Sequence, residues 1–155
     1  MSLSRQDIHR ETLEEEATHI TDEARMVLPG VQAILGFQLM AIFNQRFEQL
    51  SHGEQLVHLA SFLLTATAMG LIMAPAAYHR LVERDRVSRR FVDLSSTLLC
   101  AAMLPFIAAV ALDAYLVSRM ILQETWAGLL VAGTTVVILG GLWFGLPLGE
   151  RRRRD

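Results

Sequence analysis

Four long apolar stretches alternate with charged segments along this 155-residue chain. A hydrocarbon core of about 30 Å requires roughly 20 predominantly apolar residues per spanning helix, and each stretch meets that length. The pattern therefore predicts an all-α, polytopic membrane protein whose four transmembrane helices form a bundle. The predicted spans are Met26–Phe47, Gln55–Tyr78, Val92–Leu116 and Thr125–Leu148.

A polar segment precedes the first predicted span. Acidic side chains outnumber apolar ones between Ser4 and Arg25, which favours a solvated or surface-docked helix over an independent domain. Its carboxylates either pair with the arginine-rich loop of the same or a neighbouring chain or leave the segment as a frayed, charged tail. We therefore divide the chain into a polar N-terminal helix or tail (1–25), a four-helix transmembrane domain (26–148) and a basic tail (149–155).

The arginines predict the orientation of the spans, because short loops rich in Arg stay on the cytoplasmic side of a membrane. Five arginines lie between the second and third spans and four follow the last span, whereas the two other loops offer only Arg46 and Arg119. Both termini are therefore expected in the cytoplasm. A basic membrane surface attracts anionic lipid headgroups at about 1 kcal/mol per charge. Membrane lipids are thus the expected partners, and nucleic acid is not.

Polar residues within the predicted helices mark the faces that pack against protein, because lipid offers them no hydrogen-bond partner. In the first span, Gln32 and Gln38 fall on two different faces at 100° per residue. In the second span, one face runs from His58 through Thr65 to His79. Together these residues form a candidate polar pathway through the bundle.

The last span carries a pattern of small residues. Gly141 and Gly145 are four positions apart, which lets two helix backbones approach closely. We expect this face to pack against another helix, either within the chain or between copies in a homo-oligomer.

Charged side chains occur at matching depth near both ends of the spans, as judged from a rise of about 1.5 Å per residue. Near the outer margin, an ion pair between Asp113 and Arg46 would lower the cost of burying either charge. Such residues either fix helix packing or form a site that moves ions or protons, and both interpretations stay open. A second cluster, at the inner margin, consists of Arg25, His79, Arg80 and Asp93.

The same inner-margin residues belong to three runs that carry a family resemblance. The runs are Arg25-Met-Val-Leu-Pro-Gly-Val-Gln32, Gly36-Phe-Gln38 and Ala74-Pro-Ala-Ala-Tyr-His-Arg80. Over nearly all of residues 21–147 the chain resembles an uncharacterised bacterial family of small four-span membrane proteins, a domain of unknown function. The resemblance implies the four-span topology and a place in the bacterial cytoplasmic membrane, and it brings no activity.

Three classes of function follow from these observations. The first is an oligomeric ion or proton channel or transporter, favoured by the polar residues and the glycines. The second is a non-transporting accessory or scaffold subunit of a membrane complex, or a lipid-interacting protein. The third, a membrane enzyme or haem protein, is disfavoured because catalytic motifs are lacking and histidines occur in only one span. We therefore expect no enzymatic activity, no cofactor and no metal.

Overall fold

The computed structural model describes residues 12–82 and 87–154, and every element within them is helical. The predicted N-terminal segment up to residue 11, and Arg84 and Arg86 of the basic loop, lie outside the described residues. Four helices are long and apolar enough to cross a membrane, so the predicted fold class is confirmed. The elements are α1 (Leu13–Ile42), α2 (Gln45–Glu48), α3 (His52–Val82), α4 (Arg89–Leu122), α5 (Thr125–Gly140), a π-helical turn η1 (Gly141–Gly145) and α6 (Leu146–Arg154).

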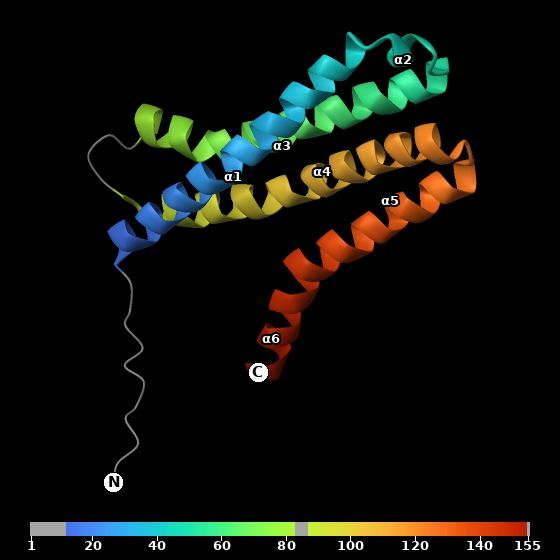
Figure 1. Cartoon of the computed structure of the whole chain (residues 1–155). Helices are drawn as coiled ribbons and strands as arrows, with labels where there is room; N and C mark the ends of the chain where they lie inside the picture. Colours follow the sequence, from blue (N-terminus) through green and yellow to red (C-terminus); the bar gives the residue numbers. More distant parts are fainter. Residues whose placement is uncertain (1–11, 83–86, 155) are drawn as a thin grey trace.

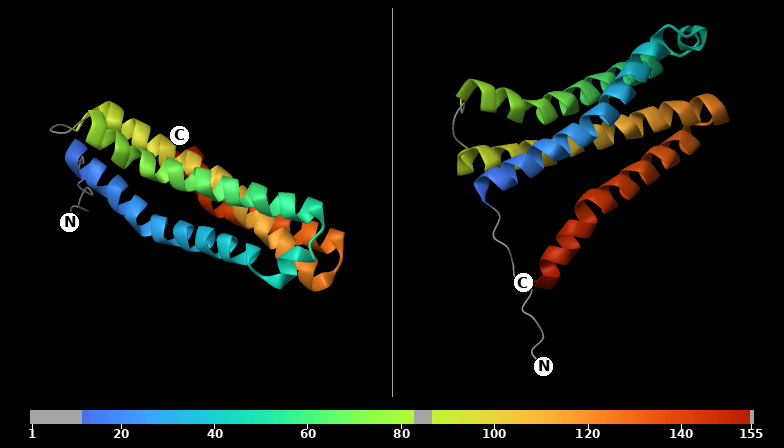
Figure 2. Two further views of the ribbon diagram at one scale, coloured as in Figure 1. Left: turned by 90° about the horizontal axis from the view of Figure 1, so that it is seen from above. Right: turned by 60° about the vertical axis from the view of Figure 1, so that its left-hand side comes forward.

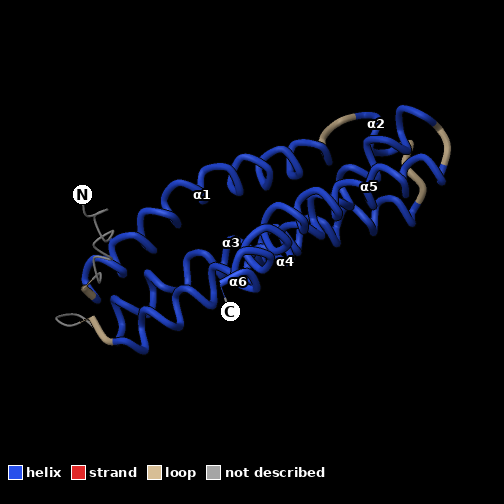
Figure 3. The backbone as a smooth tube through the Cα atoms, turned by 90° about the horizontal axis from the view of Figure 1, so that it is seen from below, coloured by secondary structure: helices blue, strands red, loops and turns tan. Residues whose placement is uncertain are grey.

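Three of the long helices, α1, α3 and α4, pack against one another side by side (Figure 1). The fourth rod, α5 with η1 and α6, runs back along α4 and then bends away from the other helices (Figures 1 and 2). Loops lie only at the ends of the rods (Figure 3). We call one end, with α2 and the α4–α5 turn, the α2 end. The other, where α1 and α4 begin and α3 ends, is the Phe91 end.

A capping box begins α1. The Thr12 hydroxyl accepts a hydrogen bond from the Glu15 amide at 3.3 Å, and the Glu15 carboxylate accepts one from the Thr12 amide at 2.8 Å. The helix then continues without interruption through Arg25 and with Pro29 inside it. The predicted polar helix and the first predicted span are therefore parts of one helix.

The other end of α1 lies at Ile42, whereas the sequence predicted a span reaching Phe47. Asn44 provides the reason, because its side-chain oxygen accepts a hydrogen bond from the Arg46 amide at 3.0 Å and caps α2. A residue in this capping position adopts an extended backbone, so the chain leaves the path of α1 there. Arg46 consequently lies on α2 and not on a straight extension of α1.

The start of α1 is attached to the start of α4. Ala17, Phe91 and Val92 form a buried apolar cluster, and the Arg89 guanidinium donates to the Glu16 carboxylate at 3.1 Å. The ion pair is partly exposed and contributes little, so apolar burial provides most of the attachment. The sequence left docking and fraying of the acidic segment open; from residue 12 onward the segment is docked.

At Gly128, α5 lies close against α4. A Cβ atom there would lie 2.9 Å from Cδ2 of Tyr115 and 3.2 Å from the Tyr115 carbonyl oxygen. Such distances are too short for a side chain, so glycine is required for this contact.

Gly141 and Gly145 do not make the close helix contact within the described chain that their spacing suggested. No atom of another helix lies within 4 Å of a Cβ position on either residue; the nearest atom to Gly145 is the Gly140 carbonyl oxygen at 4.0 Å. The reason is that the last rod diverges from α4 (Figure 2). Trp143 of η1 stacks on Phe106 of α4, with ring centroids 6.1 Å apart. A contact between copies of the chain stays a prediction.

Candidate functional site

A hydrogen-bonded triangle joins three helices in the half of the bundle near the α2 end. Gln38 of α1 donates from Nε2 to Oδ2 of Asp113 on α4 at 2.8 Å and to Oγ of Ser61 on α3 at 2.8 Å. Ser61 Oγ lies 2.8 Å from Asp113 Oδ1 and 2.9 Å from the Ala109 carbonyl oxygen. Its single hydroxyl proton serves one of these acceptors at a time. Both carboxylate oxygens therefore face neutral donors.

The orientation of the Gln38 amide follows from the carboxylate. An amide oxygen placed 2.8 Å from an ionised carboxylate would be repelled, so the amide nitrogen faces Asp113. Both amide protons are then used, and the Gln38 Oε1 atom is buried without a hydrogen-bond partner among the described residues. Gln38 itself is only 4% exposed. A buried acceptor of this kind is costly unless a donor reaches it.

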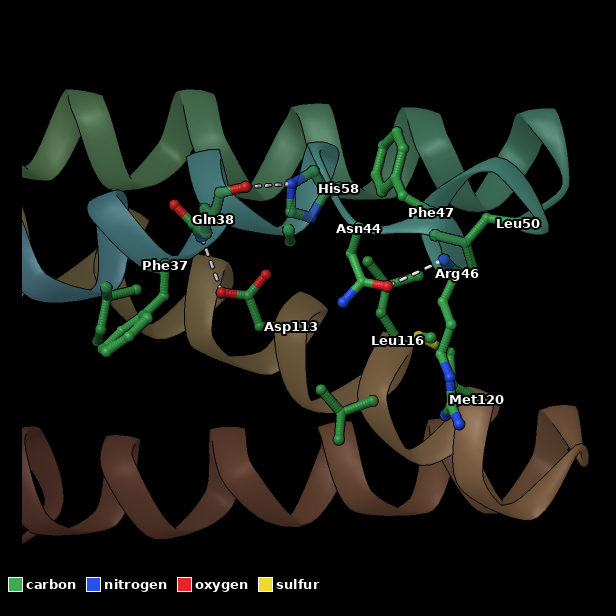
Figure 4. Close-up of a pocket in the computed structure, with 13 residues that line it drawn as sticks. Phe37, Gln38, Asn44, Arg46, Phe47, Leu50, His58, Asp113, Leu116 and Met120 are labelled. Atoms are coloured by element: carbon green, nitrogen blue, oxygen red, sulfur yellow. Dashed lines mark hydrogen bonds between the residues drawn. The ribbon is translucent and has the colours of Figure 1, made fainter.

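His58 completes the polar group. Its Nε2 lies 2.9 Å from the Gln38 main-chain carbonyl oxygen (Figure 4). Because a carbonyl oxygen only accepts, Nε2 must carry a proton. The ring is buried and meets the edge of Phe47, with centroids 5.2 Å apart. His58 therefore ties α3 to the backbone of α1 and closes one side of the site.

Asp113 borders an open pocket of about 350 Å³ in the half of the bundle near the α2 end (Figure 4). Asp113, Gln38 and His58 border it, together with apolar side chains of α1 and α4. Asn44 and Arg46 border it at α2. The geometry is that of a mostly apolar cavity with a few convergent polar groups, as small-ligand sites usually are.

The predicted ion pair between Asp113 and Arg46 is not formed within the described residues. The prediction assumed a straight first helix, whereas Asn44 turns the chain before Arg46. The Arg46 side chain is exposed at the rim of the pocket, and Figure 4 shows it beside Met120. The ion pair at this end instead joins Arg119 to Glu54 at 3.7 Å.

The pocket does not continue through the bundle. Towards the Phe91 end the interior is closed by the side chains of Val31, Ile72 and Ala102, which are 1%, 6% and 2% exposed. Thr65 is buried but bonds its hydroxyl to the Ser61 carbonyl oxygen of its own helix at 3.1 Å. Gln32 is exposed on the outer surface of α1. The candidate polar residues therefore do not form a continuous pathway in the described part of one chain.

Ser61 is central to the triangle but was not among the candidate residues. It lies three positions after His58 on the same face of α3 and is fully buried. That spacing placed it on an interior face, and the sequence offered no further signal that its hydroxyl meets Asp113.

Comparison with known families decides the classification of the chain. The model of the "Family of unknown function (DUF6328)" matches residues 6–147. The chain belongs to this family. No curated protein and no solved structure shows a significant match. Membership in DUF6328 covers all four long helices and brings no activity, so the function must be argued from the site.

At the Phe91 end of this DUF6328 protein, three of the four predicted inner-margin residues gather. Arg25, His79 and Arg80 border a second pocket of about 470 Å³, and the His79 Nδ1 atom is buried without a described partner. Asp93 does not join them. It is exposed on the surface of α4 and lies 3.7 Å from Arg89, one turn earlier on the same helix.

Proposed function

We propose that this DUF6328 protein is a membrane transporter that binds a proton or another small cation at Asp113. One observation carries the proposal: the Asp113 carboxylate borders an open pocket, and among the described residues its hydrogen-bond partners are the neutral donors Gln38 and Ser61. An ionised Asp at membrane depth costs about 2.5–3.5 kcal/mol, and hydrogen bonds between membrane helices average about 0.6 kcal/mol. Two such bonds offset only about 1 kcal/mol, so cation binding is favourable here.

A carrier with a closed interior fits the site better than an open pore. The buried cluster of Val31, Ile72 and Ala102 lies on the Phe91 side of the Asp113 pocket, and a proline lies within three positions of each of these residues. Proline removes a backbone hydrogen bond and is the usual place where a helix bends. Bending at this level would open the Phe91 side as the α2 side closes. The paired residues are Val31 with Pro29, Ile72 with Pro75, and Ala102 with Pro105.

Ion flux in liposomes tests this proposal. Purified protein is reconstituted, and fluxes driven by proton, potassium and chloride gradients are compared for wild type, Asp113→Asn and Asp93→Asn. Asp93→Asn is the matched control because it removes an exposed carboxylate from the same helix. We expect cation flux in wild type and Asp93→Asn and none above empty liposomes in Asp113→Asn. Cation flux that survives in folded Asp113→Asn protein contradicts the proposal, as does a wild type that moves no cation.

We further propose that the Phe91 end faces the cytoplasm and that both termini lie there, in the bacterial cytoplasmic membrane. The arginine distribution supports this orientation, and Arg25 and Arg80 at this end suit anionic lipid headgroups. Single cysteines at Ser88 and Ser51, in a chain with Cys100 replaced, separate the two orientations. In intact cells an impermeant thiol reagent should label the cysteine at Ser51 and spare the one at Ser88. The reverse pattern would exclude this orientation.

A second candidate, an accessory subunit without transport, is favoured by the last helix. Along α5 only Ala127 and Gly128 are buried, so most of that helix is free to meet another protein or a second copy of this chain. This role predicts wild-type protein without flux that purifies in a fixed ratio with a larger membrane complex. Transport predicts flux by the protein purified alone.

A further inference from the structure

The Asp113 pocket offers a carboxylate, which is a hydrogen-bond acceptor and a negative charge. The Gln38 amide uses both protons within the triangle, which leaves Gln38 Oε1 buried without a partner among the described residues. The Asp113 carboxylate beside it can only accept when ionised. A group suited to this carboxylate carries at least one N–H donor together with a positive charge.

The remaining walls of the pocket are apolar and leave room for more than an ion. Ile34 and Phe37 of α1 and Leu116 and Val117 of α4 are among the residues that line it, and its volume is about 350 Å³. Small-molecule sites usually fall at about 300–1,000 Å³ and combine apolar walls with few polar groups. A proton or a bare metal ion would leave this apolar surface unused.

We propose that the pocket takes an amphiphilic organic ammonium ion whose N–H groups bind the Asp113 carboxylate. Its apolar body lies between α1 and α4 and points toward the α2 end. This inference rests on the proposed role of Asp113 as the cation-binding carboxylate and names the class of cation. Arg46 stands exposed at the rim, so the ammonium group is held at the Asp113 end and the uncharged body near Arg46.

Two probes of equal charge distinguish hydrogen bonding from charge alone. 2-Phenylethylammonium carries three N–H donors, whereas its N,N,N-trimethyl analogue has the same ring and charge but no donor. Equilibrium dialysis of each probe is performed with the full chain in lipid nanodiscs, and with empty nanodiscs to subtract partitioning into lipid. We expect the primary amine to bind at least about tenfold more tightly than the analogue, because a hydrogen bond to a charged group is worth about 1.5–3 kcal/mol.

Variants assign the binding to the site. Asp113→Asn should abolish binding of the primary amine, and Asp93→Asn should leave it unchanged. Equal affinities for the two probes, no binding to wild type, or binding that survives in folded Asp113→Asn protein would each overturn the inference. The experiments test the inference and the proposed function separately. Proton flux that depends on Asp113, without amine binding, would contradict only the proposal of an organic cation. Amine binding without any flux would contradict only the proposal of transport.

Discussion

Gln38 donates a 2.8 Å hydrogen bond to Asp113 across 75 positions of sequence, and this bond joins α1 to α4 within the apolar part of the bundle. A neutral amide thus occupies the place where the sequence suggested a cation from Arg46. The difference determines the chemistry of the site. A carboxylate paired with arginine is neutralised in place, whereas one held by neutral donors keeps its charge available for a cation.

Ser61→Ala should destabilise the protein by about 1 kcal/mol, because Gln38 and Asp113 each lose a hydrogen-bond partner. Thr67→Ala is the control, since Thr67 lies exposed on the same helix and bonds only the Leu63 carbonyl oxygen of its own turn. Thermal unfolding in detergent measures both variants. Equal melting temperatures for the two would show that the triangle does not stabilise the bundle.

Gly128→Ala should cost about 1–3 kcal/mol, because the new methyl group meets the Tyr115 ring and backbone. Gly133→Ala on the same helix has no neighbouring atom within 4 Å and should be neutral or slightly stabilising. The melting temperatures of the two variants test the packing of α5 on α4. If Gly128→Ala were as stable as wild type, the helices would not approach as closely as described.

Gly141→Leu and Gly145→Leu should leave the stability of the single chain unchanged, since no other helix lies against these positions. If the chain forms a homo-oligomer through this face, both variants should lower the oligomer mass measured by light scattering or native mass spectrometry. Unchanged mass in both variants would place the glycines against lipid.

Phe91→Ala should destabilise the Phe91 end by about 3–5 kcal/mol, as expected for a buried aromatic residue. Arg89→Ala, which removes the ion pair with Glu16, should cost less than about 1 kcal/mol because the pair is partly exposed. Limited proteolysis near residue 12 and thermal unfolding report both effects. Equal losses for the two variants would show that charge, rather than apolar burial, attaches the start of α1.

The sequence predicted the number of helices and several of their interior faces, because lipid leaves polar side chains few places to point. His58 and Thr65 lie buried on the face of α3 that their spacing indicated, and Gln38 is buried where Gln32 is not. Which of two polar faces of a helix packs against a given neighbouring helix depends on how the helix is rotated about its own axis and on which helices it contacts. Periodicity within one helix does not contain that information.

Local turn chemistry explains the larger differences. The capping role of Asn44 was readable in the sequence, but the apolar residues around it suggested one uninterrupted span. The predicted place of Arg46 on a straight first span was wrong for that reason. At Gly128 the sequence contained no signal of the contact that the structure shows. Gly128 does not belong to the pattern of Gly141 and Gly145, and its contact with Tyr115 of α4 is what makes glycine necessary there.

The most direct measurement of the central claim is chemical modification of Asp113 in the membrane. A hydrophobic carbodiimide reacts with protonated carboxyl groups in apolar surroundings, and mass spectrometry of the digested protein locates the product. We predict that Asp113 is modified, that exposed Asp93 is spared and that flux falls in proportion to the Asp113 product. An unmodified Asp113, or full modification with undiminished flux, would contradict the assignment of Asp113 as the cation-binding carboxylate.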